Sequence, residues 1–444
     1  MDSTKLALRT GLCRYREYRD SGVESLGEIP MHWLVKRLKF VSQVVAGQSP
    51  PSAAVSEGMD GVPFLQGNAE FGQVHPEACQ SCDSAPKTAR PGDILLSVRA
   101  PVGALNVADQ VYGIGRGLCA LRPVAGVDRS FYFYALMAIR PLLGAVGCGS
   151  TYDAVTRSDV GGLPMPIPPE NEQRAIAEFL DRETANLDAL VGRKERLIQL
   201  LQEKRAALIA RAVTGGLTAR VPIKDSGVEW LGEIPSHWDV KRMKFSARLY
   251  SGHTPSRQNP DYWKDCTIPW FGLADVWQIR DGQAEYVVDT SEKISEAGLV
   301  NSAATLLPKG TVILSRTASV GFSAILGVDM ATTQDFVNWV CGQSLRPEYL
   351  LYVLRAMEQE FRRLTMGSTH QTIYMPDVGS FVAPVPPLVE QDQIVAYIRS
   401  EKADIEALIR DVVAAIGYVK EYRSAVVSTA VTGKIDVRQA TIAQ

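Results

Sequence analysis

The tetrapeptide NPDY, residues 259–262, comes closest to a catalytic pattern in this sequence. N6-adenine methyltransferases hold a flipped base with a similar tetrapeptide, Asn/Asp-Pro-Pro-Tyr/Phe, from which this chain departs at the third position. No glycine-rich strand-loop-helix that would bind S-adenosylmethionine precedes it at a suitable distance. Asn-Pro-Asp is also ordinary turn chemistry. A turn is therefore the prediction, and a self-contained adenine methyltransferase that uses NPDY is an alternative.

Other residues that could bind a metal or catalyse a reaction are sparse. Cys79 and Cys82 form one CxxC with His75 nearby, and a single pair is a weak indication of zinc, so structural cysteines are the prediction. The run GIGRG, residues 113–117, lacks an informative glycine spacing, and the sequence contains no P-loop, HExxH or GxSxG. The five histidines give no triad. We expect no catalytic, cofactor-binding or metal-binding residue in this chain.

The composition is that of a soluble globular protein and excludes a disordered chain. Of 444 residues, 46% are hydrophobic and 22% charged; the formal net charge is −2 and the pI about 6.3. A protein that coats nucleic acid nonspecifically usually carries a basic excess, which is absent here. The longest apolar run, residues 131–139, is too short to span a bilayer, and the N-terminus lacks an apolar stretch. We expect a cytoplasmic protein of two or three domains.

One turn-rich segment occurs twice in the chain. Residues 20–50 and 225–255 share 19 identities in 31 aligned positions, including DSGVE, LGEIP, HW and VKR. A second block pairs GDILLSVRAPVG, residues 92–103, with GTVILSRTASVG, residues 310–321; each is an apolar run that ends in a loop, which predicts a strand and a turn. A third block pairs the segments that begin at Gly149 and Gly367. The offset grows from 205 to 218 positions, so the chain is a tandem duplication whose second copy gained 13 residues.

Each copy ends in a segment predicted to be one long helix. Both segments follow Pro-Pro, open on acidic residues, contain no proline and almost no glycine, and close on AVTG with glycine at the C-cap. Apolar residues recur at steps of three and four along one narrow stripe of each helix. The stripes are Ile176, Leu180, Leu187, Leu190, Leu197, Leu201 and Leu208 in the first copy, and Ile394, Ile398, Ile405, Leu408, Val412, Val419 and Val426 in the second.

A narrow stripe on a helix of roughly 65 Å requires a partner helix, and the other copy supplies one. The alternative is that each helix packs on its own module, although a module of about 135 residues has a radius of gyration of only about 14 Å. We predict an α+β fold: two similar α/β modules with pseudo-two-fold symmetry, separated by two long helices that form an antiparallel coiled coil. In this arrangement the N-terminal segment lies near the C-terminal tail.

The predicted boundaries follow the repeat. They are 1–19 for the N-terminal segment that closes the arrangement, 20–168 for the first recognition module, 169–215 for the first long helix, 216–224 for a linker, 225–386 for the second module, 387–433 for the second long helix and 434–444 for the tail.

Two similar but unequal modules on a rigid spacer have the geometry to read two half-sites on a DNA duplex, because B-DNA has local two-fold axes. Basic clusters beside the repeated HW could neutralise phosphates, strand-end residues could reach base edges, and the diverging loops could set the sequence. The same residues could instead form solvated strand faces, surface ion pairs and structural turns. The candidate DNA-binding residues are Lys36, Arg37, Lys39, Gln48, Ser49, Arg99, Thr151, Tyr152, Lys241, Arg242, Lys244, Thr254, Ser256, Arg257, Gln258, Arg316, Thr317, Thr369, His370 and Gln371.

A family resemblance rests on DSGVEWLGEIPSHWDVKRMK, TPSRQNPDYWKDCTIPW, GDILLSVRAPVG and PIPPENEQRAIAEFL, with long helices that end in AVTG. These motifs resemble those of the specificity subunit of type I restriction-modification systems, over nearly all of the chain and twice in the same order. The resemblance implies two target recognition domains joined by conserved helical regions. It also implies a noncatalytic reader of an asymmetric bipartite DNA site with a fixed nonspecific spacer.

The same resemblance implies partners and cofactors outside this chain. Two modification subunits would bind S-adenosylmethionine and methylate adenine at N6, and restriction subunits would be ATP- and Mg-dependent motor nucleases. No base-contact residue carries over, because recognition loops diverge within the family. An alternative from a different class is a coiled-coil adaptor whose two modules bind protein or glycan.

Overall fold

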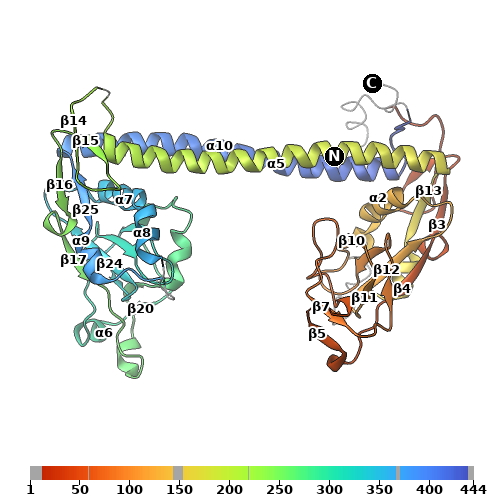
Figure 1. Cartoon of the computed structure of the whole chain (residues 1–444), viewed down its shortest axis with the longest axis horizontal. Helices are drawn as coiled ribbons and strands as arrows, with labels where there is room; N and C mark the ends of the chain where they lie inside the picture. The colour runs from red at the N-terminus through yellow and green to blue at the C-terminus, as the bar shows by residue number, and fades with distance from the viewer. Residues whose placement is uncertain (1–12, 59, 144–153, 219, 367–370, 439–444) are drawn as a thin grey trace. The chain divides into compact units, whose positions relative to one another are not determined.

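The computed structural model describes residues 13–58, 60–143, 154–218, 220–366 and 371–438. The chain divides into two compact units, Met1–Lys194 with Val413–Gln444, and Glu195–Val412. Each unit contains one globular module and adjoining parts of two long helices, α5 (Glu170–Gly215) and α10 (Leu388–Val431) (Figure 1). The two long helices predicted from the sequence are confirmed, within two residues at each end.

The first module is built from short strands. One antiparallel sheet has the order β10-β9-β12-β4, and a mixed sheet has the order β5-β7-β6-β11-β8. The central strand β9 is buried at every position, as its unbroken apolar run predicts. The elements are β1 (Tyr18–Asp20), β2 (Glu28–Pro30), β3 (Leu34–Arg37), η1 (Leu38–Phe40), β4 (Ser42–Ala46), η2 (Ser52–Ala54), β5 (Val55–Glu57), β6 (Val62–Leu65), β7 (Gln80–Cys82), β8 (Thr88–Ala89), β9 (Ile94–Ser97), β10 (Leu105–Val107), β11 (Tyr112–Ile114), β12 (Leu118–Pro123), α2 (Arg129–Ile139), α4 (Arg157–Gly162) and β13 (Pro164–Ile167).

The second module repeats this plan. Its main sheet has the order β17-β24-β21-β22-β19, and a smaller sheet the order β20-β18-β23. The elements are β14 (Ile223–Asp225), β15 (Glu233–Pro235), β16 (Asp239–Arg242), η3 (Met243–Phe245), β17 (Ala247–Ser251), η4 (Pro260–Trp263), β18 (Ile268–Phe271), η5 (Leu273–Gln278), β19 (Tyr286–Val287), β20 (Lys293–Ile294), α6 (Glu296–Val300), β21 (Val312–Ser315), β22 (Ser323–Leu326), β23 (Ala331–Thr332), β24 (Phe336–Cys341), α7 (Pro347–Ala356), α8 (Glu358–Thr365), α9 (Met375–Ser380) and β25 (Val382–Val385).

Strand register confirms that the two modules are copies. Ala46 lies opposite Cys119 where β4 pairs with β12, and Ser251 lies opposite Val337 where β17 pairs with β24. These are the residues that the repeat aligns, at offsets of 205 and 218. The predicted fold class of two similar α/β modules with long helices is therefore confirmed.

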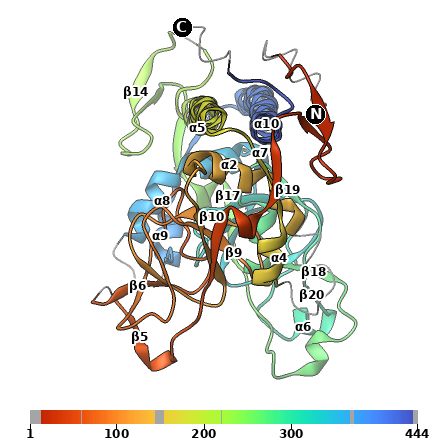
Figure 2. The ribbon, with the colours of Figure 1, turned by 90° about the vertical axis from the view of Figure 1, so that its right-hand side faces the viewer.

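Within each unit the two long helices run antiparallel and touch the module. In the first unit the start of α5 and the end of α10 share one apolar core with the sheet, to which α5 gives Ile176 and Leu180 and α10 gives Val426. Figure 2 shows the two helices side by side against this module. Arg423 of α10 donates to Asp188 of α5 at 2.9 Å. The alternative that helices pack on modules is thus correct for the helix ends.

The second unit uses the opposite ends of the same helices. Its core takes Ile209 and Val213 from the end of α5, and Ile394 and Ile398 from the start of α10.

Burial corrects part of the predicted stripes. Leu197 and Leu408 are 40% and 49% exposed, so they are not seam residues. A straight helix drifts about 20° per seven-residue step relative to a fixed partner, which turns such positions outward. The other stripe residues are buried at Ile176, Leu180, Leu201, Ile394, Ile398, Ile405, Val412 and Val426, and half-buried at Leu187, Leu190, Leu208 and Val419.

The predicted meeting of the N-terminal segment and the C-terminal tail is confirmed in the first unit. Asp436 N donates to Cys13 O at 2.8 Å, and the Tyr18 hydroxyl donates to Gly433 O at 2.9 Å. In the second unit the equivalent position is taken by the continuous stretch that follows α5. Lys224 donates to Trp238 O there, as Arg19 donates to Trp33 O in the first unit. Among the described residues, no helix has the combination of length and apolarity that a membrane span needs.

Candidate nucleic-acid interface

The repeated His-Trp pair anchors each module to the first turn of a long helix. Trp33 Nε1 donates to Glu172 Oε2 at 2.9 Å, and His32 Nε2 lies 2.8 Å from Oε1. In the second unit, Trp238 Nε1 donates to Glu390 at 2.9 Å and His237 Nε2 lies 2.7 Å from it. A carboxylate in the first helical turn is stabilised by the helix dipole. The repeated segment that contains the His-Trp pair therefore orients each module on its long helix.

A buried glutamine beside each of these glutamates makes the same three hydrogen bonds in both units. Gln173 accepts from Asp128 N at 2.8 Å and donates to Pro168 O and Gly126 O. Gln391 accepts from Arg346 N at 2.8 Å and donates to the carbonyls of Pro386 and Ser344. Because the amide is fully satisfied, it fixes the direction in which each helix leaves its module.

Replacing each tryptophan by phenylalanine tests the anchor, because both indoles are fully buried but their acceptors differ. The Glu172 side chain is 5% exposed and that of Glu390 is 34% exposed. We expect Trp33→Phe to cost about 1 kcal/mol more stability than Trp238→Phe, since water can replace the indole at Glu390 but not at Glu172. Urea unfolding followed by hydrogen exchange in each unit measures this, and equal losses would contradict it.

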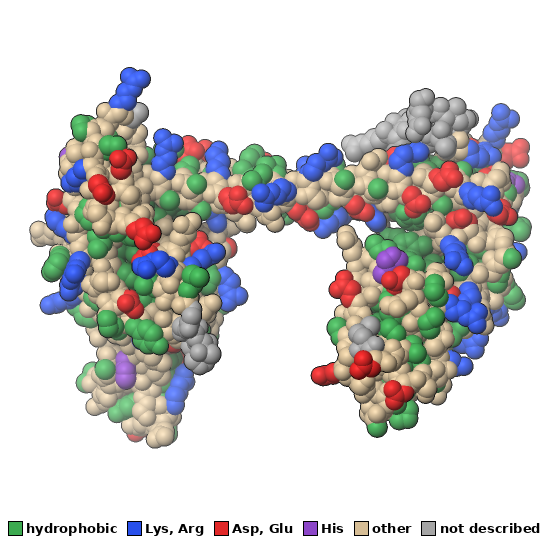
Figure 3. Space-filling model, viewed as in Figure 1, with side chains coloured by type: hydrophobic (Ala, Val, Ile, Leu, Met, Phe, Trp, Pro, Cys, Tyr) green, Lys and Arg blue, Asp and Glu red, His purple; other side chains and the backbone are tan. Residues whose placement is uncertain are grey.

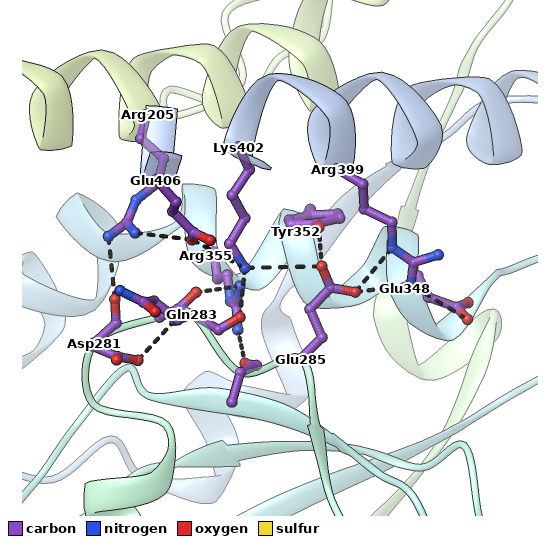
Figure 4. Close-up of polar contacts among 12 residues, drawn as sticks. Arg205, Asp281, Gln283, Glu285, Glu348, Tyr352, Arg355, Arg399, Lys402 and Glu406 are labelled. Atoms are coloured by element: carbon purple, nitrogen blue, oxygen red, sulfur yellow. Dashed lines mark hydrogen bonds and ion pairs between the residues drawn. The ribbon is translucent and has the colours of Figure 1, made fainter. Parts of the chain in front are cut away.

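A group of charged side chains fastens the second module to α10 (Figure 4). We call Glu285, Tyr352, Arg355, Arg399 and Lys402 the helix lock. Arg399 donates to Glu285 at 2.8 and 3.0 Å, Tyr352 of α7 also donates to Glu285, and Lys402 Nζ donates to Gln283 O at 2.6 Å. Arg355 donates to the carbonyls of Gly282 and Ala284. The lock thus holds a module loop against the helix.

The electrostatics of the lock favour the charged carboxylate. Burial by itself would raise the pKa of Glu285, but hydrogen bonds from Tyr352 and Arg399 and the charges of Arg399 and Lys402 outweigh it and lower that pKa. Burial raises the pKa of Tyr352, which keeps its hydroxyl a donor. In the first unit the equivalent Tyr134 donates directly to Asp181 of α5 at 2.7 Å.

Three loops of the first module meet at one edge, and glycines allow the approach. A Cβ on Gly47 would lie 2.1 Å from Gly115 O, which no side chain could tolerate. Gln48 N donates to Ile114 O at 2.8 Å, Val98 N to Gly117 O at 2.9 Å, and Arg116 N to Ser49 Oγ at 3.3 Å. This packing leaves Arg116 and Arg99 exposed. A polar hollow of about 450 Å³ is lined in part by Ser49, Gln66, Gln80 and Arg116.

The second module builds the same edge with different side chains. A Cβ on Gly252 would lie 2.0 Å from Thr333 O. His253 N donates to Thr332 O at 2.9 Å and Arg316 N to Asp335 O at 2.8 Å, while the Thr254 hydroxyl donates to the exposed Gln334. We call these surfaces the loop edges: Ser49, Arg99 and Arg116 in the first module, and Thr254, Thr317 and Gln334 in the second.

The loop edges bring together several predicted DNA-binding residues. Arg99 and Thr317 occupy equivalent places, since Arg99 bridges Ala154 and Thr317 bridges Thr372 through the backbone. Gln48 is exposed beside Ser49, and the backbone oxygen of Gln371 accepts from Ala318 N beside Thr317. Thr151, Tyr152, Thr369 and His370 lie outside the described residues.

Two predicted arginines have other roles in the structure. Arg316 donates from Nε to Gln334 O at 3.0 Å and from Nη1 to Ile373 O at 3.4 Å, so it supports the loop edge from beneath. Arg257 stacks on Trp263, 3.8 Å from the ring centroid, and donates to Glu292. Both guanidinium groups are engaged within the module. Ser256 accepts from Gln258 N at 3.3 Å, and the Gln258 side chain is exposed.

The predicted basic clusters do not lie at the loop edges. Lys36 and Arg37 are on β3, and Lys39 is in η1; Lys241, Arg242 and Lys244 take the equivalent places in the second module. η1 precedes β4, whereas the loop edge follows it. Figure 3 shows Lys and Arg side chains along this part of the first module, over β3 and β4. The structure therefore does not bring these cations together with the loop edge.

Two motifs weighed in the sequence as possible chemical sites make structural contacts. NPDY forms the turn predicted for it, because Asn259 Oδ1 accepts from Asp261 N at 3.1 Å at the start of η4. Cys82 is buried, and the His75 ring donates to Val107 O at 2.9 Å. Among the residues that the structure describes, no group of three or more His, Cys, Asp or Glu side chains could hold a metal ion.

Comparison with known proteins identifies the family. A family model described as the type I restriction modification DNA specificity domain matches residues 30–199 and 235–413. The chain belongs to this family. Each matched segment contains one module's loop edge and its anchor to a long helix.

Relatives of this specificity-domain family span different shares of the chain. This chain is 34% identical over 213 residues to the putative type I restriction enzyme MjaX specificity subunit of Methanocaldococcus jannaschii. The alignment covers 47% of this chain and 48% of that protein. Identity to the EcoBI specificity subunit of Escherichia coli is 21% over 444 residues, covering 95% and 90%. The chain spans about half or less of the first curated relatives that it matches.

Solved structures of the family show the same fold. One concerns complex assembly and conformational transition of the type I R-M system; it is 21% identical, with a TM-score of 0.62, over 90% of this chain and 98% of the other. The HsdS subunit from Thermoanaerobacter tengcongensis is 19% identical, with a TM-score of 0.50, over 92% and 98%.

Sequence reasoning missed Arg116 and Gln334 of the loop edges, and Gln66, which lines the polar hollow. Arg116 stands inside GIGRG, whose glycine spacing is uninformative, and the available signal is a lone arginine between glycines just before strand β12. Gln334 is its equivalent at an offset of 218, and the hydroxyls beside them, Ser49 and Thr254, are also equivalent.

Proposed function

We propose that this chain is the noncatalytic DNA-recognition subunit of a type I restriction-modification complex. It reads an asymmetric bipartite site, one half-site with each module, across a nonspecific spacer. The observation that carries the proposal is the pair of loop edges, which share a backbone arrangement but differ in side chains. A shared scaffold with unequal readers is what two different half-sites require.

The side chains of the loop edges suit base recognition. Arginine bonds bidentately to guanine O6 and N7, and glutamine to adenine N6 and N7. Arg116 and Gln334 are exposed, and the Arg116 side chain makes no hydrogen bond or ion pair to any described residue. The His-Trp anchors attach each module to its long helix, and in the second module the helix lock adds a further attachment.

Catalysis belongs, in this proposal, to partner subunits. Two modification subunits bind S-adenosylmethionine and methylate adenine, and restriction subunits use ATP and Mg. The relatives' names as specificity subunits of type I restriction enzymes support this assignment. No cofactor is assigned to the chain itself.

An exchange of modules tests the proposal. Residues 20–168 are replaced by the matching module of another family member, and the complex with its modification subunit is used to methylate a random-sequence DNA library. Sequencing of the methylated products should show one half-site changed and the other retained. A change in both half-sites, or methylation without a gapped motif, would overturn the proposed function.

A further inference from the structure

An exposed aromatic and basic cluster occurs at the same place in both modules. Phe40 is 66% exposed and Phe245 is 75% exposed. Lys39 Nζ lies 5.1 Å from the Phe40 ring centroid, and Lys244 Nζ lies 5.6 Å from that of Phe245. We call this surface the lysine–phenylalanine patch, made of Lys36, Arg37, Lys39 and Phe40 in the first module, and Lys241, Arg242, Lys244 and Phe245 in the second.

The patch has no structural role that explains its residues. Apart from the exposed pair of Lys241 with Asp239, its cationic groups make no ion pair with any described residue. A phenyl ring that is two thirds or more exposed contributes little burial to the folded chain, and aromatic rings are typical of interface hot spots. The two copies nonetheless have the same residue at all four positions, while some neighbouring exposed positions differ, as Met31 and Ser236 do.

The patch and the loop edge lie at opposite ends of one strand. Phe40 ends η1, β4 then runs for five residues, about 16 Å at 3.3 Å per residue, and Ser49 follows beyond its end. The second module has the same order: Phe245 ends η3, β17 follows, and Thr254 lies beyond it. The patch is therefore separated along the strand from the surface proposed to read DNA.

Identity of the patches contrasts with divergence of the loop edges. Arg99 and Arg116 have Thr317 and Gln334 as their equivalents, as two unequal half-sites demand. A surface whose residues are identical in both modules should contact the same partner at each module. Two copies of one protein satisfy this condition. The phosphate backbone also does, but a phenyl ring offers phosphate no hydrogen bond and needs an apolar recess to be buried.

We propose that each lysine–phenylalanine patch docks one copy of the same protein, through an acidic surface that contains an apolar recess for the phenyl ring. This inference rests on the proposed function, in which two modification subunits assemble on one specificity chain, and it assigns their docking points. Lysine and arginine select the acidic partner, and the phenylalanine provides the buried anchor.

Stoichiometry provides the test. The full chain is co-purified with its modification subunit as wild type, as Lys39→Glu with Phe40→Ser, as Lys244→Glu with Phe245→Ser, and with all four changes. Native mass spectrometry counts the bound copies across a dilution series. Each altered patch should lose its copy with at least tenfold weaker binding, so single-patch chains retain one copy and the four-residue variant none. The control is Met31→Ser, which changes an exposed apolar residue outside the patch to the residue found at the equivalent Ser236. This variant should retain both copies.

Thermal unfolding of the purified variants should match wild type, because all altered side chains are exposed. Two bound copies in every variant would overturn the docking proposal. Normal assembly with weaker DNA binding and a smaller salt dependence would also overturn it and assign the patch to the phosphate backbone. These results are separate from failure of the proposed function, which would appear as a wild-type complex that recognises no gapped DNA motif.

Discussion

Exchanging the side chains at residues 116 and 334 is expected to exchange the base preferred at one position of each half-site. Arg116→Gln should replace a guanine preference with an adenine preference in one half-site, and Gln334→Arg should do the reverse in the other. The two positions are equivalent in the repeat and each lies beside an equivalent hydroxyl, because the Arg116 backbone N donates to Ser49 Oγ and Gln334 Oε1 accepts from the Thr254 hydroxyl. Each bidentate contact discriminates by about 1–3 kcal/mol, or about 5- to 150-fold.

The measurement is binding of the assembled complex to a randomised library, at fixed salt, with each variant compared with wild type. Arg316→Lys is the matched control, because Arg316 supports the edge from beneath through Gln334 O and Ile373 O and is expected to weaken binding without changing the preferred base. An unchanged motif in both exchange variants would remove residues 116 and 334 from base recognition.

The elements that the sequence predicted well are those with local signals. Long helices have caps and an unbroken period, and both ends of α5 and α10 fall where Pro-Pro and AVTG place them. The internal repeat added what a single copy could not, because it aligned Arg99 with Thr317 before any contact was known. The repeat therefore predicts that the loops at the strand ends could contact DNA bases.

What the sequence did not predict depends on contacts between distant segments. Arg116 and Ser49 are 67 positions apart and meet only because Gly47 and Gly115 allow two loops to touch. The contacts of Arg257 with Trp263 and Glu292 likewise depend on tertiary packing, so the sequence did not show that this candidate DNA-binding residue has partners within the module. Leu197 is exposed although it belongs to the predicted apolar stripe of α5. Which stripe residues are buried depends on where the partner helix lies, and the sequence of one helix does not contain that information.

Removing the carboxylate of the helix lock should loosen the second module on α10. Glu285→Ala leaves Arg399 and Tyr352 without their shared acceptor and removes the 3.9 Å ion pair of Lys402 with Glu285, and loss of one partner from a buried ion pair costs about 3–5 kcal/mol. Because the Arg399 side chain is 43% exposed, solvent screening reduces this, and we expect a loss of about 2 kcal/mol. Hydrogen exchange in residues 281–287 and 395–406 measures it. Glu358→Ala, which removes only an exposed pair with Arg362, should cost under about 0.5 kcal/mol.

The contribution of Glu285 also sets a pH dependence. Its folded pKa is lowered below the ordinary glutamate value, so the stability it adds is fully present above the unfolded pKa of about 4.3. That stability is lost as the pH falls through the folded pKa, because the unfolded chain binds the proton first. The difference in unfolding free energy between wild type and Glu285→Ala should therefore be constant from pH 7 to pH 5.5 and shrink below pH 4.3. A gap that persists unchanged at pH 3 would mean that Glu285 acts through packing rather than charge.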